Sequence, residues 1–235
     1  MPFVAESLIS EEKRIREAYA RRQSGHLYSR FNPGYLLMVQ EREKCLLRLL
    51  SRYHCEDLER KKFLEIGCGS GDLLRDFIKW GARPENMAGV DLLSERIAEA
   101  VHLCPKAIEI RQCNAATLDY SDETFDVVVQ STVFTSVLEV DMRRQMAAEM
   151  LRVVKPTGLI LWYDYHVNNP WNKDVRGVKR REIYRLFPDC RIQLKRITLL
   201  PPLARVIAPY SYLICYLLEK FPPLCTHYLG VIRKG

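Results

Sequence analysis

The feature that most constrains this chain is a short apolar run that leads into three alternating glycines. Phe63–Ile66 is apolar except for Glu65, and Gly67, Gly69 and Gly71 follow it. The run predicts a buried strand, and glycine lets the chain leave that strand in conformations that a Cβ would forbid. Apolar residues then recur at helical spacing. A strand, a glycine turn and a helix N-terminus together predict a site for part of a nucleotide-like ligand.

The glycine spacing and the acid before it narrow the choice of ligand. The pattern is Gly-x-Gly-x-Gly, whereas dinucleotide enzymes use Gly-x-Gly-x-x-Gly. A carboxylate at Glu65 repels a pyrophosphate and attracts a cation. S-adenosylmethionine carries an ammonium, a sulfonium and an α-carboxylate but no phosphate, so it fits an acid beside a helix N-terminus. A dinucleotide oxidoreductase is therefore disfavoured.

A second acid stands at the spacing expected for a ribose-binding carboxylate. Met87–Leu92 reads as a short strand, and Asp91 lies about twenty residues beyond the last glycine. This carboxylate can accept hydrogen bonds from both ribose hydroxyls, each worth about 1.5–3 kcal/mol. A glycine turn alone is a weak signal, but the two elements in this order and spacing are a much stronger one.

With these segments the chain resembles the class I S-adenosylmethionine-dependent methyltransferases, in particular the small-molecule type, over residues 60–165. After the third strand that family has an Asp-Ala pair near the adenine amino group, and here Asn114 and Ala115 take those places. The side-chain oxygen of Asn114 can still accept that N–H. Phe125–Gln130 is similar to the fourth strand of the family, and Arg152–Gly158 to the turn before the fifth.

The resemblance implies a Rossmann-like α/β fold with a seven-stranded sheet, mostly parallel with a C-terminal antiparallel strand, and helices on both faces. It implies S-adenosyl-L-methionine as the cofactor. The cofactor-binding residues that we expect lie at the carboxyl ends of successive strands, where ligands bind in such sheets. They are Glu65, Gly67, Cys68, Gly69, Gly71, Asp91, Leu92, Asn114, Ala115 and Gln130.

Strands and helices alternate along the middle of the chain, which independently predicts a parallel sheet covered on both faces. Strands are expected near 62–66, 87–91, 107–111, 125–130 and 158–163. Helices are expected near 71–80, 94–103 and 140–152. A short basic helix, a strand (191–200), a helical insert (203–220) and a last strand (226–232) follow. Towards the N-terminus, Ser10 before two acids and Asn32 before Pro33 are two helix-start signals.

At 235 residues the chain is expected to form a single methyltransferase domain. Residues 1–58 are expected to be an N-terminal helical cap over the cofactor site, and residues 59–165 the cofactor-binding core. Residues 166–235 are expected to supply a substrate loop, C-terminal strands and the helical insert.

Two residues after the expected fifth strand are the candidate catalytic groups. Methyl transfer is an in-line displacement in which the enzyme mainly aligns the reacting atoms, but a hydroxyl nucleophile also gains from a general base. His166 can take a proton near neutral pH, and Asp164 can act itself or orient the imidazole. The alternative is that Asp164 caps a turn and His166 is a surface or packing residue.

The net charge, the N-terminal sequence and the cysteine spacing limit the expected partners and location of the chain. The formal net charge of +7 favours an anionic substrate, a nucleic acid or an anionic membrane surface, or else reflects an ordinary solvated surface. No signal peptide is expected, so the expected location is the cytoplasm, with peripheral membrane contact through 203–220 as an option. The eight cysteines form no Cys-x-x-Cys pair and predict reduced thiols, with no metal site.

The expected function is methyl transfer to a small-molecule acceptor that is anionic or lipid-linked, at an oxygen of a sugar, glycolipid or other secondary metabolite. The basic stretch Lys173–Arg185 can bind phosphate or form a solvated face. An RNA or protein methyltransferase is the nearest alternative, although no separate RNA-binding module is visible. A non-catalytic, cofactor-binding scaffold is the alternative from another class, because fold alone does not decide function.

Overall fold

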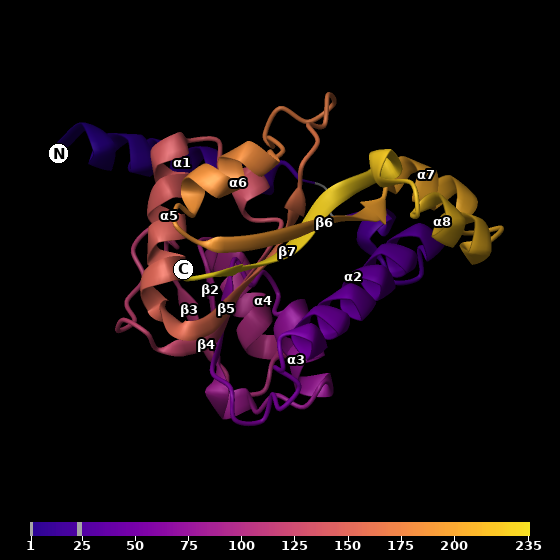
Figure 1. Ribbon diagram of the computed structural model, residues 1–235. Coiled ribbons are helices and arrows are strands. Elements are labelled where there is room, and N and C mark those ends of the chain that lie inside the picture. The colour runs from indigo at the N-terminus through magenta and orange to yellow at the C-terminus, as the bar shows by residue number, and fades with distance from the viewer. Residues whose placement is uncertain (1, 23–24) are drawn as a thin grey trace.

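A seven-stranded sheet forms the centre of the computed structural model, which describes residues 2–22 and 25–235 (Figure 1). The strand order is β3-β2-β1-β4-β5-β7-β6. β7 runs antiparallel to both of its neighbours, and the other adjacent pairs are parallel. The expected fold class is confirmed. The strands are β1 (Phe63–Ile66), β2 (Met87–Asp91), β3 (Glu109–Gln112), β4 (Phe125–Ser131), β5 (Val154–Tyr165), β6 (Arg191–Leu199) and β7 (Cys225–Arg233).

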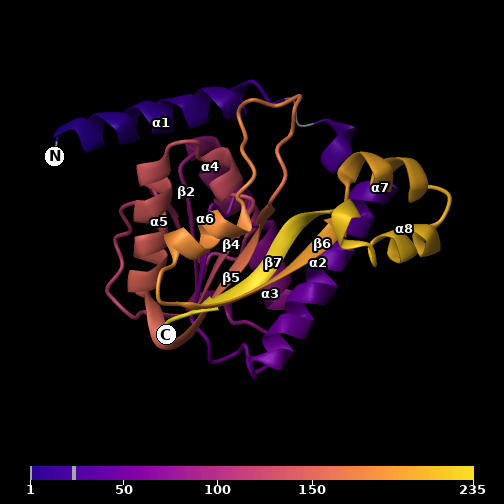
Figure 2. The ribbon, with the colours of Figure 1, turned by 45° about the horizontal axis from the view of Figure 1, so that its top comes forward.

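Helices cover both faces of this sheet, with α5 and α6 on one face and α2 and α3 on the other (Figures 1 and 2). The strands and helices expected in the middle of the chain are present, although β5 starts four residues earlier than expected. The helices are α1 (Pro2–Ala20), α2 (Pro33–Arg52), α3 (Asp72–Lys79), α4 (Ser94–Leu103), α5 (Val140–Val153), α6 (Arg180–Leu186), α7 (Pro201–Ile207) and α8 (Tyr212–Leu218).

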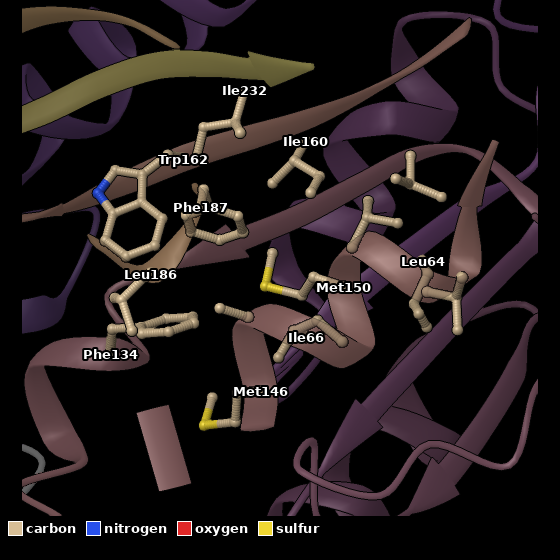
Figure 3. Packing of buried hydrophobic residues seen from close by; sticks show 14 of the residues in the cluster. Leu64, Ile66, Phe134, Met146, Met150, Ile160, Trp162, Leu186, Phe187 and Ile232 are labelled. Carbon is tan, nitrogen blue, oxygen red and sulfur yellow. The ribbon is translucent and has the colours of Figure 1, made fainter. Parts of the chain in front are cut away.

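The side chains of β5 alternate between the two faces of the sheet, and helices bury both faces. Ile160 and Trp162 belong to the cluster under α5 and α6, whereas Leu159 and Leu161 belong to the cluster under α2 and α3. Figure 3 shows the first cluster, in which Met150 of α5 lies among the strand side chains. Successive side chains of a strand point to opposite faces, so a strand that is apolar at every position must be buried on both.

The helix start at Asn32 is confirmed. Its side-chain Oδ1 accepts from the amide nitrogens of Gly34 at 3.0 Å and Tyr35 at 3.3 Å. The prediction of a helix start at Ser10 is wrong, because α1 already begins at Pro2.

Glu11, one of the two acids behind that prediction, makes long-range contacts instead. Glu11 is buried, and its carboxylate pairs with Arg14 and accepts from the backbone amides of Leu138 and Glu139 before α5. Glu11 therefore links α1 to the segment before α5. The local sequence pattern does not distinguish an acid with this long-range contact from an acid in the first turn of a helix.

The helical insert near the C-terminus is two short helices rather than one. The break between α7 and α8 contains Pro209, which lacks an amide donor, and Ser211 caps α8 by accepting from the Ile214 amide at 3.3 Å. α7 packs closely on the start of α2, since a Cβ added at Gly34 would lie 2.6 Å from the Cα of Arg205. Within residues 2–22 and 25–235, none of the helices has the length and apolarity to cross a membrane.

Candidate functional site

A cavity of about 300 Å³ lies at the carboxyl ends of β1, β2 and β4. From β1 the chain adds β2 and then β3 on one side of the sheet. It then returns to add β4 on the other side of β1, so the strand order reverses at β1. Ligands of open α/β sheets bind at such a point. Eight of the expected cofactor residues line this cavity, namely Glu65, Gly67, Cys68, Gly69, Asp91, Leu92, Asn114 and Ala115.

The glycine turn is packed from behind and open in front. Gly67, Gly69 and Gly71 have φ angles of +66°, +53° and +77°, which disfavour residues with a Cβ. A Cβ at Gly67 would lie 2.4 Å from a methyl group of Val133, and one at Gly71 would lie 2.4 Å from the sulfur of Cys104. A Cβ at Gly69 would have no atom of the described chain within 4 Å. The bare main chain at Gly69 therefore offers a cradle on which a ligand can rest.

Asp91 fixes the shape of this turn from the end of β2. Its Oδ2 accepts from the Gly69 amide at 2.9 Å, and its Oδ1 accepts from the Leu93 amide at 2.9 Å. Each carboxylate oxygen has a further lone pair, so Asp91 can still accept from ribose hydroxyls. This one side chain can therefore hold both the ligand and the turn that cradles it.

Glu65 is a buried acid with an unused oxygen. It is 3% exposed, and its Oε2 has no hydrogen-bond partner among the described residues. Burial raises the pKa of this carboxyl well above its usual range, and the Arg42 guanidinium opposes that shift. A buried, unpartnered carboxylate oxygen is costly until a cation meets it. The cavity wall at Glu65 therefore fits an ammonium group.

Asn114, at the expected adenine position, contacts Glu12, a residue that sequence reasoning missed. Asn114 Oδ1 accepts from the Ala116 amide at 2.8 Å, and its Nδ2 donates to Glu12 Oε1 at 2.6 Å. Glu12 comes from α1, which is 102 positions away. The amide of Asn114 is thus oriented by two bonds, and a carboxylate from α1 stands beside it. No local signal in the sequence pairs these two positions.

Arg42 of α2 is a second residue that sequence reasoning missed. Its guanidinium lines the cavity and donates to the hydroxyl of Ser131, at the end of β4, at 3.2 Å. A signal was present, since position 42 shares a helix face with the buried residues Met38, Cys45 and Leu46. A charged residue on an otherwise buried face indicates a partner in the interior.

Gly71, Gln130 and Cys68, three of the expected cofactor residues, each have a structural role in the fold. Gly71 ends the turn at the N-cap of α3 and is not part of the cavity lining. Gln130 is fully buried and accepts from the Val133 amide at 3.2 Å, so it lies behind the wall, and its contact with the cofactor stays a prediction. Cys68 lines the cavity, and burial raises the pKa of its thiol, which agrees with a small filler.

Asp164 lies outside the cavity lining. It is fully buried and accepts from the hydroxyl and the amide of Thr135, the latter at 3.2 Å, and from the Tyr165 amide at 2.8 Å. Burial raises its pKa to about 6. Through Thr135 it holds the turn that places Ser136 on the cavity wall. The geometry therefore gives Asp164 a role in capping that turn.

His166 also lies outside the cavity lining. It is 7% exposed, its Nε2 donates to the carbonyl of Cys225 at 2.9 Å, and burial lowers its pKa. Its ring packs against Tyr228 with a centroid distance of 4.5 Å. A part for Asp164 or His166 in proton transfer stays a prediction, and their contacts correspond to the alternative of turn capping and packing.

Comparisons with known proteins find methyltransferases similar to the central part of this chain. A family model described as a methyltransferase domain matches residues 63–158. A ubiquinone biosynthesis O-methyltransferase of Brucella ovis is 31% identical over 134 residues, which are 56% of this chain and 51% of that protein. A phthiotriol/phenolphthiotriol dimycocerosates methyltransferase of Mycobacterium ulcerans is 28% identical over 132 residues, 54% of this chain and 47% of that protein. The chain thus spans about half the length of these curated relatives.

The fold is also shared with solved structures. An S-adenosylmethionine-dependent methyltransferase from Clostridium acetobutylicum superposes with a TM-score of 0.62, at 11% identity, over 83% of this chain and 92% of its own. The matched domain, the strand order and the glycine-turn cavity agree, and over residues 63–158 the chain is similar to the methyltransferase domain of the class I S-adenosylmethionine-dependent methyltransferases. The cavity fits the cofactor of that family, because Glu65 offers a free oxygen for its ammonium and Gly69 an open main chain.

Replacement of Glu65 by glutamine is expected to have opposite effects on stability and on binding. The raised pKa means that the folded state keeps a proton that the unfolded chain loses near pH 4.3, roughly. The stabilisation that this proton gives the folded state is complete below that pH, and it is lost as the pH rises through the pKa of Glu65 in the folded state. Glu65→Gln should therefore raise the free energy of unfolding above neutral pH, while affinity for S-adenosylhomocysteine falls roughly tenfold.

Urea denaturation without ligand and calorimetry with S-adenosylhomocysteine measure these two effects. 5′-Methylthioadenosine lacks the ammonium and serves as the control ligand, for which affinity should not change. A variant that is less stable than the native chain above neutral pH would contradict the buried-carboxylate account.

Replacement of Arg42 by glutamine tests whether α2 holds the α-carboxylate of the cofactor. A lost charge-assisted bond is worth about 1.5–3 kcal/mol, so Arg42→Gln should weaken S-adenosylhomocysteine binding at least roughly tenfold. Affinity for 5′-methylthioadenosine should stay the same, because that molecule has no carboxylate. Equal losses for both molecules would show that Arg42 supports the wall rather than the amino-acid end of the cofactor.

Proposed function

We propose that the chain transfers a methyl group from S-adenosylmethionine to an oxygen atom of a small molecule that is anionic or lipid-linked. The observation that carries the proposal is that one cavity brings together three acids and three arginines, namely Glu65, Asp72, Asp91, Arg30, Arg42 and Arg96. Glu65 and Asp91 suit the cationic and ribose parts of the cofactor, and Arg30 and Arg42 come from the side of α2. When bound, the cofactor supplies an activated methyl group on a positively charged sulfur.

The α2 side of the cavity is the proposed acceptor side. Tyr35, Arg30 and Arg42 line it together with Thr132, which directly follows β4. Guanidinium groups bind carboxylates and phosphates well, and since Arg42 is assigned to the α-carboxylate of the cofactor, Arg30 is the group that supports an anionic acceptor. A cavity of about 300 Å³ matches the lower end of small-molecule sites. Alignment of reactants in such a walled site can account for up to about 7–11 kcal/mol of a barrier.

The choice of oxygen is supported by relatives that are named as O-methyltransferases. The Brucella ovis protein is named as an O-methyltransferase of ubiquinone biosynthesis and is 31% identical to this chain over the shared segment. Among the described residues, the cavity lining contains no histidine. We therefore propose an acceptor oxygen that ionises readily or loses its proton to water, so that positioning carries most of the catalysis.

The basic stretch 173–185 gives less support to a phosphate site than its composition suggests. Lys179 donates to the carbonyl of His166 at 2.6 Å, and Arg176 pairs with Glu182 at 2.8 Å. These side chains hold the loop to the domain, and none of the stretch lines the cavity. This favours a small acceptor in the cavity over an RNA that follows the loop.

Transfer of tritiated methyl groups from S-adenosylmethionine into fractionated cell extract tests the proposal. The label should appear in a small-molecule or lipid fraction, and the Asp91→Ala variant should transfer little of it. Label in RNA or in protein would overturn the proposed acceptor class and favour the first alternative. Intact cofactor binding without transfer to any fraction would favour a non-catalytic scaffold.

A further inference from the structure

Residues 201–221 expose an unusual number of large apolar side chains. This segment, α7 to the end of the loop after α8, is called the insert below, and it projects from the body of the molecule beyond α2 (Figures 1 and 2). The exposed side chains are Val206 (66%), Tyr210 (90%), Tyr212 (45%), Leu213 (67%), Ile214 (49%), Tyr216 (44%), Leu217 (53%) and Phe221 (61%).

These side chains are not needed for the packing of the insert. Its inner face has its own small core, in which Ala204, Ala208 and Cys215 meet Leu199 of β6. Single exposed apolar residues are ordinary. Eight within twenty-one consecutive residues on one projecting element form a patch of the kind that marks an interaction surface.

Basic groups stand beside this patch. The ammonium groups of Lys220 and of Lys44 on α2 lie 4.1 and 5.4 Å from the ring centre of Tyr216. Arg48, one turn further along α2, is exposed. Two acids are near, but Glu41 pairs with Lys44, and burial raises the pKa of Glu219 to about 7. The net charge at the edge of the patch is therefore positive.

We propose that the insert rests on the surface of an anionic bilayer. Apolar and tyrosine side chains beside lysine and arginine are typical of segments that lie in the membrane interface. α7 and α8 have seven residues each and span only about 10 Å apiece, against roughly 30 Å of hydrocarbon, so the contact is superficial. The formal net charge of +7 acts in the same direction.

A second copy of the chain fits the patch less well. In a two-fold contact the same surface meets itself, so the basic groups around Tyr216 would face their own copies. An anionic lipid surface instead complements them. The surface does not depend on the proposed function, although α7 packs on the start of α2, which brings Arg42 to the cavity.

Co-sedimentation with vesicles tests the proposal. The native chain should sediment with vesicles of phosphatidylcholine and phosphatidylglycerol, and much less with phosphatidylcholine alone. Leu213→Glu with Leu217→Glu should lower the partition coefficient at least roughly tenfold, because both side chains leave the apolar layer. Val101→Glu on α4 is the matched control, since Val101 is 57% exposed and far from the insert in sequence, and it should bind as the native chain does.

A charge variant separates the two contributions. Arg48→Gln with Lys220→Gln should lower the partition coefficient on anionic vesicles and weaken its dependence on salt. Circular dichroism checks that each variant is folded.

The proposal is overturned if the native chain does not sediment with anionic vesicles, or if the double glutamate variant binds equally well. A dimer in analytical ultracentrifugation that the glutamates dissociate, without vesicle binding, would assign the patch to a second copy. Methyl transfer is not measured, so a failed function proposal leaves this result intact.

Discussion

Valine at position 69 should abolish binding of S-adenosylmethionine while the chain stays folded. A Cβ at Gly69 meets no atom of the described chain within 4 Å, so the valine methyl groups would stand in the cavity where the ligand rests. The backbone φ of +53° adds strain, and the free energy of unfolding should fall by about 1–3 kcal/mol. Calorimetry with S-adenosylmethionine and S-adenosylhomocysteine measures the first effect, and urea denaturation the second.

Gly81 offers a matched control for this experiment. It also has a positive φ, +108°, and a Cβ there would have no atom within 4 Å, but it lies just past the end of α3 and outside the cavity lining. Gly81→Val should lose a similar amount of stability and keep its affinity for the cofactor. If Gly69→Val binds as well as Gly81→Val, the main chain does not approach the ligand at position 69.

Alanine at position 91 should lower the affinity for S-adenosylhomocysteine at least roughly tenfold, on the order of 1.4 kcal/mol. The substitution removes the acceptors for ribose, and it also frees the amides of Gly69 and Leu93 that the carboxylate now holds. Because the ribose is common to both ligands, 5′-methylthioadenosine should weaken equally. This distinguishes Asp91 from Glu65 and Arg42, whose effects should depend on the amino-acid end of the ligand.

Asp91→Asn keeps one acceptor oxygen and should fall between the native chain and Asp91→Ala. An alanine variant that is folded and binds with unchanged affinity would remove Asp91 from the site. Stability is measured beside affinity, because the glycine turn loses two of its hydrogen bonds in this variant.

The sheet and the cofactor side of the cavity were predictable because their signals are local. An apolar run followed by alternating glycines, and an acid at the end of the next strand, are each read within about ten residues. Their meeting in space then follows from topology alone, since parallel strands end at one edge of the sheet. Eight of the ten expected cofactor residues accordingly line one cavity.

The contributions of α1 and α2 were not predictable in the same way. Glu12 reaches Asn114 across 102 positions, and Arg42 reaches Ser131 across 89. Such contacts depend on how whole helices pack, and although the pattern around Arg42 indicates an interior partner, it does not say which residue that partner is. The break at Pro209 was visible in the sequence, but whether it bends one helix or separates two depends on the packing of α7 against α2.

The bond between Asp91 and the Gly69 amide has a consequence for the thermodynamics of ligand capture. Glycine loses more freedom than any other residue when it becomes ordered. Here that loss occurs during folding, because a neighbouring strand already holds the loop. The incoming nucleoside therefore meets a preorganised surface, and little of its interaction energy is diverted into shaping the protein.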